Sequence, residues 1–227
     1  MKLLLTSAGI SNASIRNTLV DLLGKSISEA SALFVPTAIY AFPSEDPFPH
    51  GTEIAAKMIR GTIGQPFCDL GWKSFGVLEL TALPSVQKER WVTLLQQTDV
   101  LLVGGGDCQY LSYWMQQSGL ADLLPSLLDR MVYVGVSAGS MIMTRFGTTY
   151  GGHALSADTD KSLGFIPIAL HPHLDHEWFP ENSLASLEKL AATLSVPSYA
   201  IDDQSALKVV DGCVEVISEG HWKLFNG

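Results

Sequence analysis

A serine lies between small residues in the stretch VYVGVSAGSMIM, residues 132–143. Gly135 precedes Ser137 by two positions and Gly139 follows it by two, which is the G-x-S-x-G spacing of a nucleophile elbow. A serine hydroxyl becomes nucleophilic when a base takes its proton and the backbone presents Oγ clear of its surroundings. Small neighbours allow the sharp strand-to-helix turn that does so, and the following helix aims free N–H groups at an oxyanion. The alternative is that the glycines only allow tight packing and Ser137 caps a helix.

Three consecutive glycines follow an apolar run in the stretch VLLVGGGDCQYL, residues 100–111. Glycines let backbone amides approach a ligand closely, and a helix is expected to begin after them. One interpretation is an anion cradle, although neither common nucleotide-binding glycine pattern is present. Another is the second half of an oxyanion hole, and the simplest is a turn between strand and helix. The residues that could contact a substrate here are Gly104, Gly105, Gly106 and Asp107.

Half of the six histidines lie in the stretch ALHPHLDHE, residues 169–177. His171 and His173 alternate like residues on one face of a strand, and His176 follows. These residues could form a metal site, although no strong zinc spacing such as HExxH occurs. They could also supply one general base to Ser137. For any single histidine, a surface or hydrogen-bonded structural role is the alternative.

Two adjacent acids, Asp202 and Asp203, end a short apolar run in the stretch YAIDDQSALKV, residues 199–209. A carboxylate at this point could orient an imidazole and stabilise its protonated form. Adjacent acids in a turn are also common as solvated or capping groups. The residues alone leave these interpretations open.

Apolar runs that alternate with helical patterns must position these groups. The expected strands are Leu3–Ser7, Ala32–Pro36, Gly76–Leu80, Val100–Val103, Val132–Val136 and Phe165–Leu170. Several lack polar alternation, as is typical of central parallel strands covered on both faces. The expected helices are Asn12–Leu23, 51–60, 84–97, Gln109–Leu124 and Asn182–Leu194. This alternation predicts an α/β fold with a doubly wound, mostly parallel sheet.

The C-terminal part has a different pattern. SALKVVDGCVEVIS holds two alternating runs joined by Asp211-Gly212, which predicts an antiparallel hairpin. HWKLFNG could add a short edge strand. The Pro-rich segment 36–49 is expected to be a loop that could lie over the site.

Composition bounds the class of protein. A length of 227 residues with 47% hydrophobic residues predicts one domain over 1–227. The net charge of -9 argues against nucleic acid as a partner. The three cysteines are widely spaced and form no CxxC pattern, which favours a cytoplasmic protein. No apolar run approaches the roughly 18 residues that cross a bilayer, which favours a soluble protein without a membrane partner.

Taken together and in this order, the segments resemble the peptidase E (aspartyl dipeptidase) family of serine peptidases, with cyanophycinase as a related branch. The resemblance covers nearly the whole chain: the turn in LLLTSAG, the GGG loop, the elbow GVSAGS, a Pro-His pair and a late acidic turn. It implies a class I glutamine-amidotransferase-like fold, that is, a flavodoxin-like arrangement in three layers.

The resemblance also implies a role for individual residues. Ser137 falls on the nucleophile and His173, after Pro172, on the base. Asp203 falls on the acidic third member, with Asp202 as its close rival. The oxyanion hole would be the backbone N–H groups of Ala138 and Gly105.

This sequence departs from the family pattern in three places. Asp107 stands where asparagine is expected, and the third member is aspartate where peptidase E typically has glutamate. The family reads an aspartyl side chain with an arginine downstream of its histidine, but no arginine follows Arg145 here. A bidentate carboxylate clamp from that region is therefore absent.

The expected function is that of a serine hydrolase, a peptidase that cleaves short peptides by acyl transfer without a metal or organic cofactor and without an aspartyl preference. One alternative is a metal-dependent hydrolase that uses His171, His173 and His176. Another is a non-catalytic homologue that binds a small ligand. The expected partners are a short peptide substrate and, as an open alternative, a second copy in a homodimer.

Overall fold

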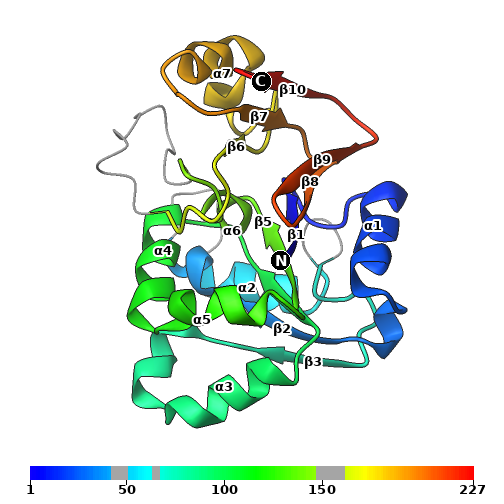
Figure 1. The fold of residues 1–227 in the computed structure, drawn as a ribbon, viewed down its shortest axis with the longest axis vertical. Coiled ribbons are helices and arrows are strands. Elements are labelled where there is room, and N and C mark those ends of the chain that lie inside the picture. The colour runs from blue at the N-terminus through cyan, green and yellow to red at the C-terminus, as the bar shows by residue number, and fades with distance from the viewer. Residues whose placement is uncertain (42–50, 63–66, 147–161) are drawn as a thin grey trace.

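Within residues 1–41, 51–62, 67–146 and 162–227, which the computed structural model describes, a seven-stranded sheet forms the centre of the molecule (Figure 1). Its strand order is β3-β2-β4-β5-β1-β8-β9. The strands that run parallel to one another are β3 (Ser74–Val77), β2 (Ser31–Val35), β4 (Val100–Val103), β5 (Val132–Val136) and β1 (Lys2–Thr6). An antiparallel hairpin of β8 (Ser205–Val210) and β9 (Cys213–Ser218) completes the sheet beside β1.

Helices connect the parallel strands. They are α1 (Ala13–Leu23), α2 (Gly51–Ile59), α3 (Lys88–Gln96), α4 (Cys108–Gln117), α5 (Leu120–Leu127), α6 (Ala138–Met141) and α7 (Leu184–Ala191). Short 3-10 helices are η1 (Ile27–Glu29), η2 (Thr37–Ala41), η3 (Leu80–Ser85) and η4 (Pro180–Asn182). The first helix shows why the boundaries fall where they do. Asn12 caps α1 by accepting the N–H of Ile15 at 3.0 Å, and Gly24 ends it with φ of 67°.

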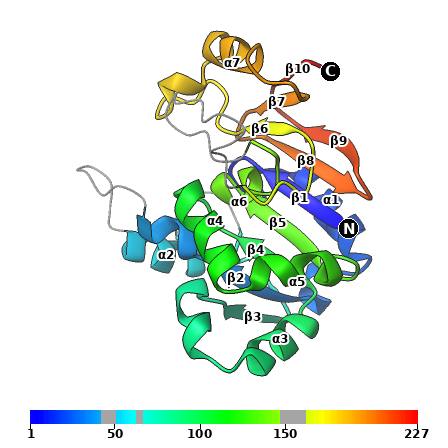
Figure 2. The same cartoon turned by 60° about the vertical axis from the view of Figure 1, so that its left-hand side comes forward.

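Two hydrophobic clusters cover the two faces of the sheet. Successive side chains of a strand point to opposite faces, so Leu3 and Leu5 of β1 pack with residues of α3, α4 and α5, whereas Leu4 packs with Ile15 and Leu19 of α1. Figure 2 shows α1 on one side of the sheet and α4 and α5 on the other. Burial on both faces explains why the inner parallel strands β1, β2, β4 and β5 are almost entirely apolar. The expected three-layer α/β fold is confirmed.

A second sheet lies beyond the end of the central sheet that carries α6 (Figures 1 and 2). It has three strands in the order β10-β7-β6: β10 (Trp222–Phe225), β7 (Ser198–Ile201) and β6 (Ala169–His171). Leu170 and Ile201 from this sheet belong to the same hydrophobic cluster as Leu5 and Val103 of the central sheet. The two sheets therefore share one core.

The expected hairpin and C-terminal strand are both present. Asp211 and Gly212 have φ of 49° and 86°, the positive values that a two-residue hairpin turn with the native strand twist requires. The strand expected in HWKLFNG is β10, which pairs with β7 in the second sheet rather than with the hairpin.

The strand expected over Phe165–Leu170 is shorter and lies elsewhere. The structure places β6 at Ala169–His171, parallel to β7 in the second sheet. Pro167 has no N–H to donate to a ladder, so only an isolated bridge between Thr144 and Ile166 precedes β6.

Other boundaries shift for local reasons. The single helix expected over Gln109–Leu124 is divided into α4 and α5, because Gly119 has φ of 76°, a left-handed value that a helix cannot contain. The helix expected over 84–97 is α3 alone, preceded by η3, which contains Pro84. The strand expected over Gly76–Leu80 is β3, and the helix expected over Asn182–Leu194 is α7.

Two further expectations concern the surroundings of the fold. The loop expected over 36–49 begins with η2, and its residues 42–49 lie outside the described residues. None of the helices in the described ranges is long and apolar enough to cross a bilayer.

Candidate active site

Ser137 occupies a strained turn between β5 and α6. Its φ of 49° and ψ of -113° are rare for a residue with a side chain, and such a conformation costs on the order of 1–3 kcal/mol. Backbone hydrogen bonds hold it: the N–H of Ser137 donates to Thr6 O at 3.1 Å, and Ser140 and Met141 donate to Ser137 O at 2.9 Å each. A strand, a serine with strained backbone angles and a helix of four residues thus follow one another here.

The glycines on either side of Ser137 are needed for close packing of the backbone. A Cβ on Gly135 would lie 2.6 Å from Gly139 O, and a Cβ on Gly139 would lie 2.2 Å from Val103 O. Both distances are far inside contact range. Tight packing and the elbow, which the sequence presents as alternatives, are thus two aspects of one turn.

A chain of hydrogen bonds connects Ser137 to an imidazole and a carboxylate. His173 Nε2 lies 3.0 Å from Ser137 Oγ, and His173 Nδ1 lies 2.7 Å from Asp203 Oδ1. A carboxylate can only accept hydrogen bonds, so Nδ1 carries a proton toward Asp203 and Nε2 is the acceptor that faces the hydroxyl. This is the arrangement in which an imidazole can take the proton of a serine.

The electrostatic environment keeps Asp203 ionised. Burial alone would raise the pKa of Asp203, but the hydrogen bonds from His173 and Ser7 and the charges of His173 and His176 together lower it below its ordinary value. His176 Nε2 lies 3.6 Å from the other carboxylate oxygen, Oδ2. A negative charge is therefore in place beside His173 to stabilise an imidazolium.

His173 itself is fixed by its backbone and by an aromatic ring. Its φ of 59° lies in the left-handed region, and its ring stacks on Phe179 with centroids 4.6 Å apart and planes 22° from parallel. It does not share a strand face with His171, because β6 ends at His171 and Pro172 cannot continue a ladder.

The three clustered histidines occupy different environments. His171 is 3% exposed, its Nε2 has no hydrogen-bond partner among the described residues, and burial lowers its pKa to about 4. His173 faces Ser137, and His176 lies beside Asp203. In the part of the chain that the structure describes, no group of three potential metal-binding side chains gathers at one point.

Asp202, the rival of Asp203, faces a different group. Its carboxylate accepts from Ser205 Oγ at 2.5 Å, from the N–H of His221 at 2.8 Å, and lies 3.0 Å from His221 Nδ1. It thereby connects the start of β8 to the segment that leads into β10. Asp203, and not Asp202, contacts His173.

The glycine loop lies directly against Ser137. A Cβ on Gly105 would lie 3.1 Å from Ser137 Cβ, and a Cβ on Gly106 would lie 2.3 Å from Ala38 O. The N–H of Gly104 donates to Val35 O at 3.0 Å and is not free for a ligand. Across the described residues, no hydrogen bond uses the N–H of Gly105 or of Ala138.

Asp107, expected as a substrate contact, caps a helix. Its Oδ1 accepts the N–H of Tyr110 at 2.7 Å at the start of α4, and its own N–H donates to Ala38 O at 3.0 Å. The carboxylate therefore has a structural role that the sequence pattern also allows.

Ser7 is a contact of the site that sequence reasoning missed. Its hydroxyl donates to Asp203 Oδ1 at 2.6 Å and accepts the N–H of His173 at 2.8 Å. The available signal was its place at the end of the first strand, in LLLTSAG, since the ends of parallel strands meet at one edge of a sheet.

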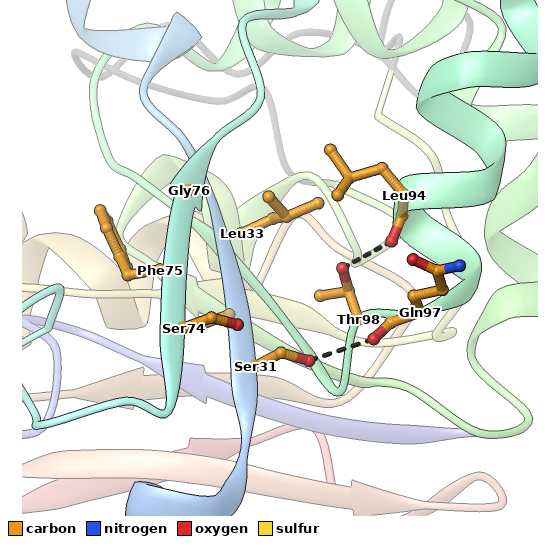
Figure 3. Close-up of a pocket in the computed structure, with 9 residues that line it drawn as sticks. Ser31, Leu33, Ser74, Phe75, Gly76, Leu94, Gln97 and Thr98 are labelled. Carbon is orange, nitrogen blue, oxygen red and sulfur yellow. Dashed lines mark hydrogen bonds between the residues drawn. The ribbon is translucent and has the colours of Figure 1, made fainter.

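A cavity of about 250 Å³ lies away from this site (Figure 3). Ser31 and Ser74 line it at the first residues of β2 and β3, the opposite edge of the sheet from Ser137, and Leu94, Gln97 and Thr98 line it near the end of α3. None of the described residues that line it is ionisable. These described residues therefore supply no acid, base or charged anchor for chemistry.

Comparison with known proteins relates the chain to peptidases. The model of peptidase family S51 matches residues 3–217. The uncharacterized peptidase YgaJ of Bacillus subtilis (strain 168) is 29% identical over 121 residues, which are 53% of this chain and 51% of that protein. This chain thus spans about half the length of that relative.

Two solved structures share the fold. A candidate peptidase E protein from Listeria monocytogenes EGD-e has a TM-score of 0.64 at 18% identity and covers 96% of this chain and 98% of its own. A peptidase from an acI-B1 Actinobacterium has a TM-score of 0.61 at 17% identity, and the match covers 97% of this chain and 88% of that peptidase. Because the family model accounts for nearly the whole chain, the protein belongs to peptidase family S51, a family of serine-type peptidases, as its resemblance to peptidase E predicts.

Proposed function

We propose that this protein is a serine peptidase that cleaves short peptides by acyl transfer through Ser137, His173 and Asp203. The observation that carries the proposal is the continuous hydrogen-bonded chain from Asp203 through His173 to a serine on a strained elbow. Nucleophile, base and orienting acid stand in the order that serine catalysis needs. Membership of family S51 supports the same class of reaction.

In the proposed mechanism, Ser137 Oγ attacks the scissile carbonyl carbon while His173 Nε2 takes the hydroxyl proton. The N–H groups of Gly105 and Ala138 donate to the oxyanion of the tetrahedral intermediate. His173 then gives its proton to the leaving amine, and the C–N bond breaks. Water attacks the acyl-enzyme with His173 as base again, which releases the acid and restores Ser137. No step needs a metal or an organic cofactor.

The substrate is proposed to be a short peptide without a required aspartyl side chain. Arg145, the last arginine of the chain, is exposed, and its guanidinium lies 5.8 Å from the ring centroid of Phe146. Lys208 pairs with Glu215 at 2.8 Å on the hairpin. Arg145 precedes His173 in the chain rather than following it, and Lys208 is a point charge without the planar bidentate fork that discriminates a substrate carboxylate.

The decisive experiment is labelling with a fluorophosphonate followed by mass spectrometry of the modified peptide. We expect a single labelled residue, Ser137, and a fall in kcat of about 10⁴-fold in Ser137→Ala with folding intact. Ser140→Ala is the control, since Ser140 lies in the helix α6 that follows Ser137 and its hydroxyl donates to Thr6 O. Labelling elsewhere, or activity that resists the reagent but is lost with a chelator, would contradict the proposal and favour a metal-dependent hydrolase.

A protein that stays unlabelled and cleaves nothing, yet binds a small ligand tightly, would instead be a non-catalytic homologue. The organisation as one domain over 1–227, a cytoplasmic location and a homodimer stay predictions from the sequence.

A further inference from the structure

We propose that Ser7 is a positioning residue of this site, whose hydroxyl fixes both the Asp203 carboxylate and the backbone of His173. The proposal rests on the proposed function, because it assigns Ser7 a task relative to the residues given catalytic roles there. Ser7 does not touch the reacting atoms. It acts through the two groups that do the orienting.

The topology of the central sheet brings Ser7 to this point. β1 ends at Thr6, which pairs with Val136 of β5 on one side and with Ala206 of β8 on the other. The next residue, Ser7, therefore lies between the elbow and the turn that carries Asp203. Its own N–H reaches Ser205 O at 3.4 Å across that junction.

The hydrogen bonds of Ser7 have only one consistent assignment. A carboxylate cannot donate, so the hydroxyl proton goes to Asp203 Oδ1 at 2.6 Å. The hydroxyl oxygen then accepts the N–H of His173 at 2.8 Å. The hydroxyl also lies 3.3 Å from His173 Nδ1, but the proton on Nδ1 belongs to the shorter contact with Asp203. Ser7 is fully buried, so its hydroxyl is shielded from solvent.

The first consequence concerns the backbone of His173. A residue with a Cβ at φ of 59° is intrinsically disfavoured. The bond from its N–H to the buried hydroxyl holds this conformation, which aims the ring toward Ser137. Removal of the hydroxyl would leave a buried N–H without its acceptor.

The second consequence concerns which imidazole, that of His173 or that of His176, the Asp203 carboxylate contacts. Oδ1 receives both Ser7 and His173, while Oδ2 lies 3.6 Å from His176. A carboxylate that is free to rotate about its Cβ–Cγ bond could turn Oδ1 out of line with His173 Nδ1 and direct an oxygen toward His176 instead. Because Ser7 donates to Oδ1, it fixes the rotation at which that oxygen faces His173.

A structural role alone is the competing explanation, and Ser140 provides the matched control. Ser140 is also fully buried, and its hydroxyl donates to Thr6 O at 2.8 Å, one residue before Ser7. It has no hydrogen bond to His173 or Asp203 among the described residues. Loss of either hydroxyl should lower stability similarly, but only loss of the Ser7 hydroxyl should slow the chemistry.

The test compares Ser7→Ala, Ser7→Cys and Ser140→Ala in kcat and KM on a dipeptide that the wild type cleaves, and in the rate of fluorophosphonate labelling at Ser137. We expect Ser7→Ala to lower kcat and the labelling rate by roughly 10- to 100-fold with KM unchanged. Ser7→Cys, whose thiol is a weak donor and acceptor of similar size, should recover part of that loss. Ser140→Ala should keep both rates within about threefold of the wild type.

The outcomes separate the two proposals. If Ser7→Ala is labelled as fast as Ser140→Ala, or changes KM alone, the positioning role is wrong. If Ser7→Ala does not fold, Ser7→Cys tests the positioning role instead. A folded Ser7→Cys protein with wild-type kcat would show that this role is wrong. Absence of labelling at Ser137 in the wild type would instead contradict the proposed function.

Discussion

We expect His171 to make the folded protein less stable as the pH falls. His171 is the last residue of β6, and it is 3% exposed. Its Nε2 has no hydrogen-bond partner among the described residues. Burial lowers the pKa of His171 to about 4, because an imidazolium there would lose its hydration. In the unfolded chain the imidazole has its ordinary pKa of about 6.5. Between these two values the unfolded state binds more protons than the folded state.

The free energy of unfolding therefore falls as the pH drops below about 6.5, and the loss is complete below about 4. On going from about pH 7.5 to about pH 5, the unfolded imidazole gains nearly one proton and the folded one gains almost none. The contribution of His171 to this loss is about 2 kcal/mol. For a chain of this size it corresponds to a fall of roughly 1 M in the urea midpoint.

The assay is urea unfolding at both pH values for the wild type and for His171→Leu, followed by tryptophan fluorescence. Leucine is close in volume and cannot take up a proton. Every other titrating group is common to both proteins, so their effects cancel in the comparison. We expect the wild type to lose about 2 kcal/mol more than the variant on acidification. An equal loss in both proteins would refute the reasoning.

Two predictions concern activity. Asp203→Asn should lower kcat on the order of 10³- to 10⁴-fold because the imidazolium loses its charged partner, whereas Asp202→Asn should keep kcat within about threefold and lower only stability. Steady-state kinetics and unfolding curves of both variants test this, and the reverse pattern would make Asp202 the acid. At fixed ionic strength, kcat/KM for Asp-Leu should exceed that for Ala-Leu, Asn-Leu or Lys-Leu by less than about 100-fold, since no arginine follows Arg145. A larger advantage for Asp-Leu would contradict this prediction and indicate an aspartyl dipeptidase.

Local patterns in the sequence are sufficient for the parts of the fold that depend on near neighbours. The elbow at Ser137 depends on small residues two positions away, and the hairpin depends on Asp211-Gly212. The buried parallel strands reveal themselves as apolar runs because both of their faces are covered. Each of these features was predictable.

What was missed depends on partners far along the chain or on backbone breaks that the apolar pattern hides. The alternation of His171 and His173 indicated one strand face, but Pro172 ends the ladder and His173 turns into a left-handed conformation. The choice between Asp202 and Asp203 depends on which carboxylate faces His173 across the junction of the two sheets. Ser7 has no motif of its own, since its contacts lie 166 and 196 residues away.

The candidate site lies where the large sheet and the small sheet meet. The serine that the elbow presents belongs to the large sheet, whereas the imidazole follows β6 of the small sheet, and the carboxylate lies on the crossing from β7 to β8. Displacement by about 1 Å between reacting groups can cost on the order of a hundredfold in rate. Under the proposed mechanism, we expect apolar side chains shared by the two sheets, such as Leu170 and Ile201, to set how well Ser137, His173 and Asp203 are aligned. Substitutions in this shared core would then change turnover while the three proposed catalytic side chains stay the same.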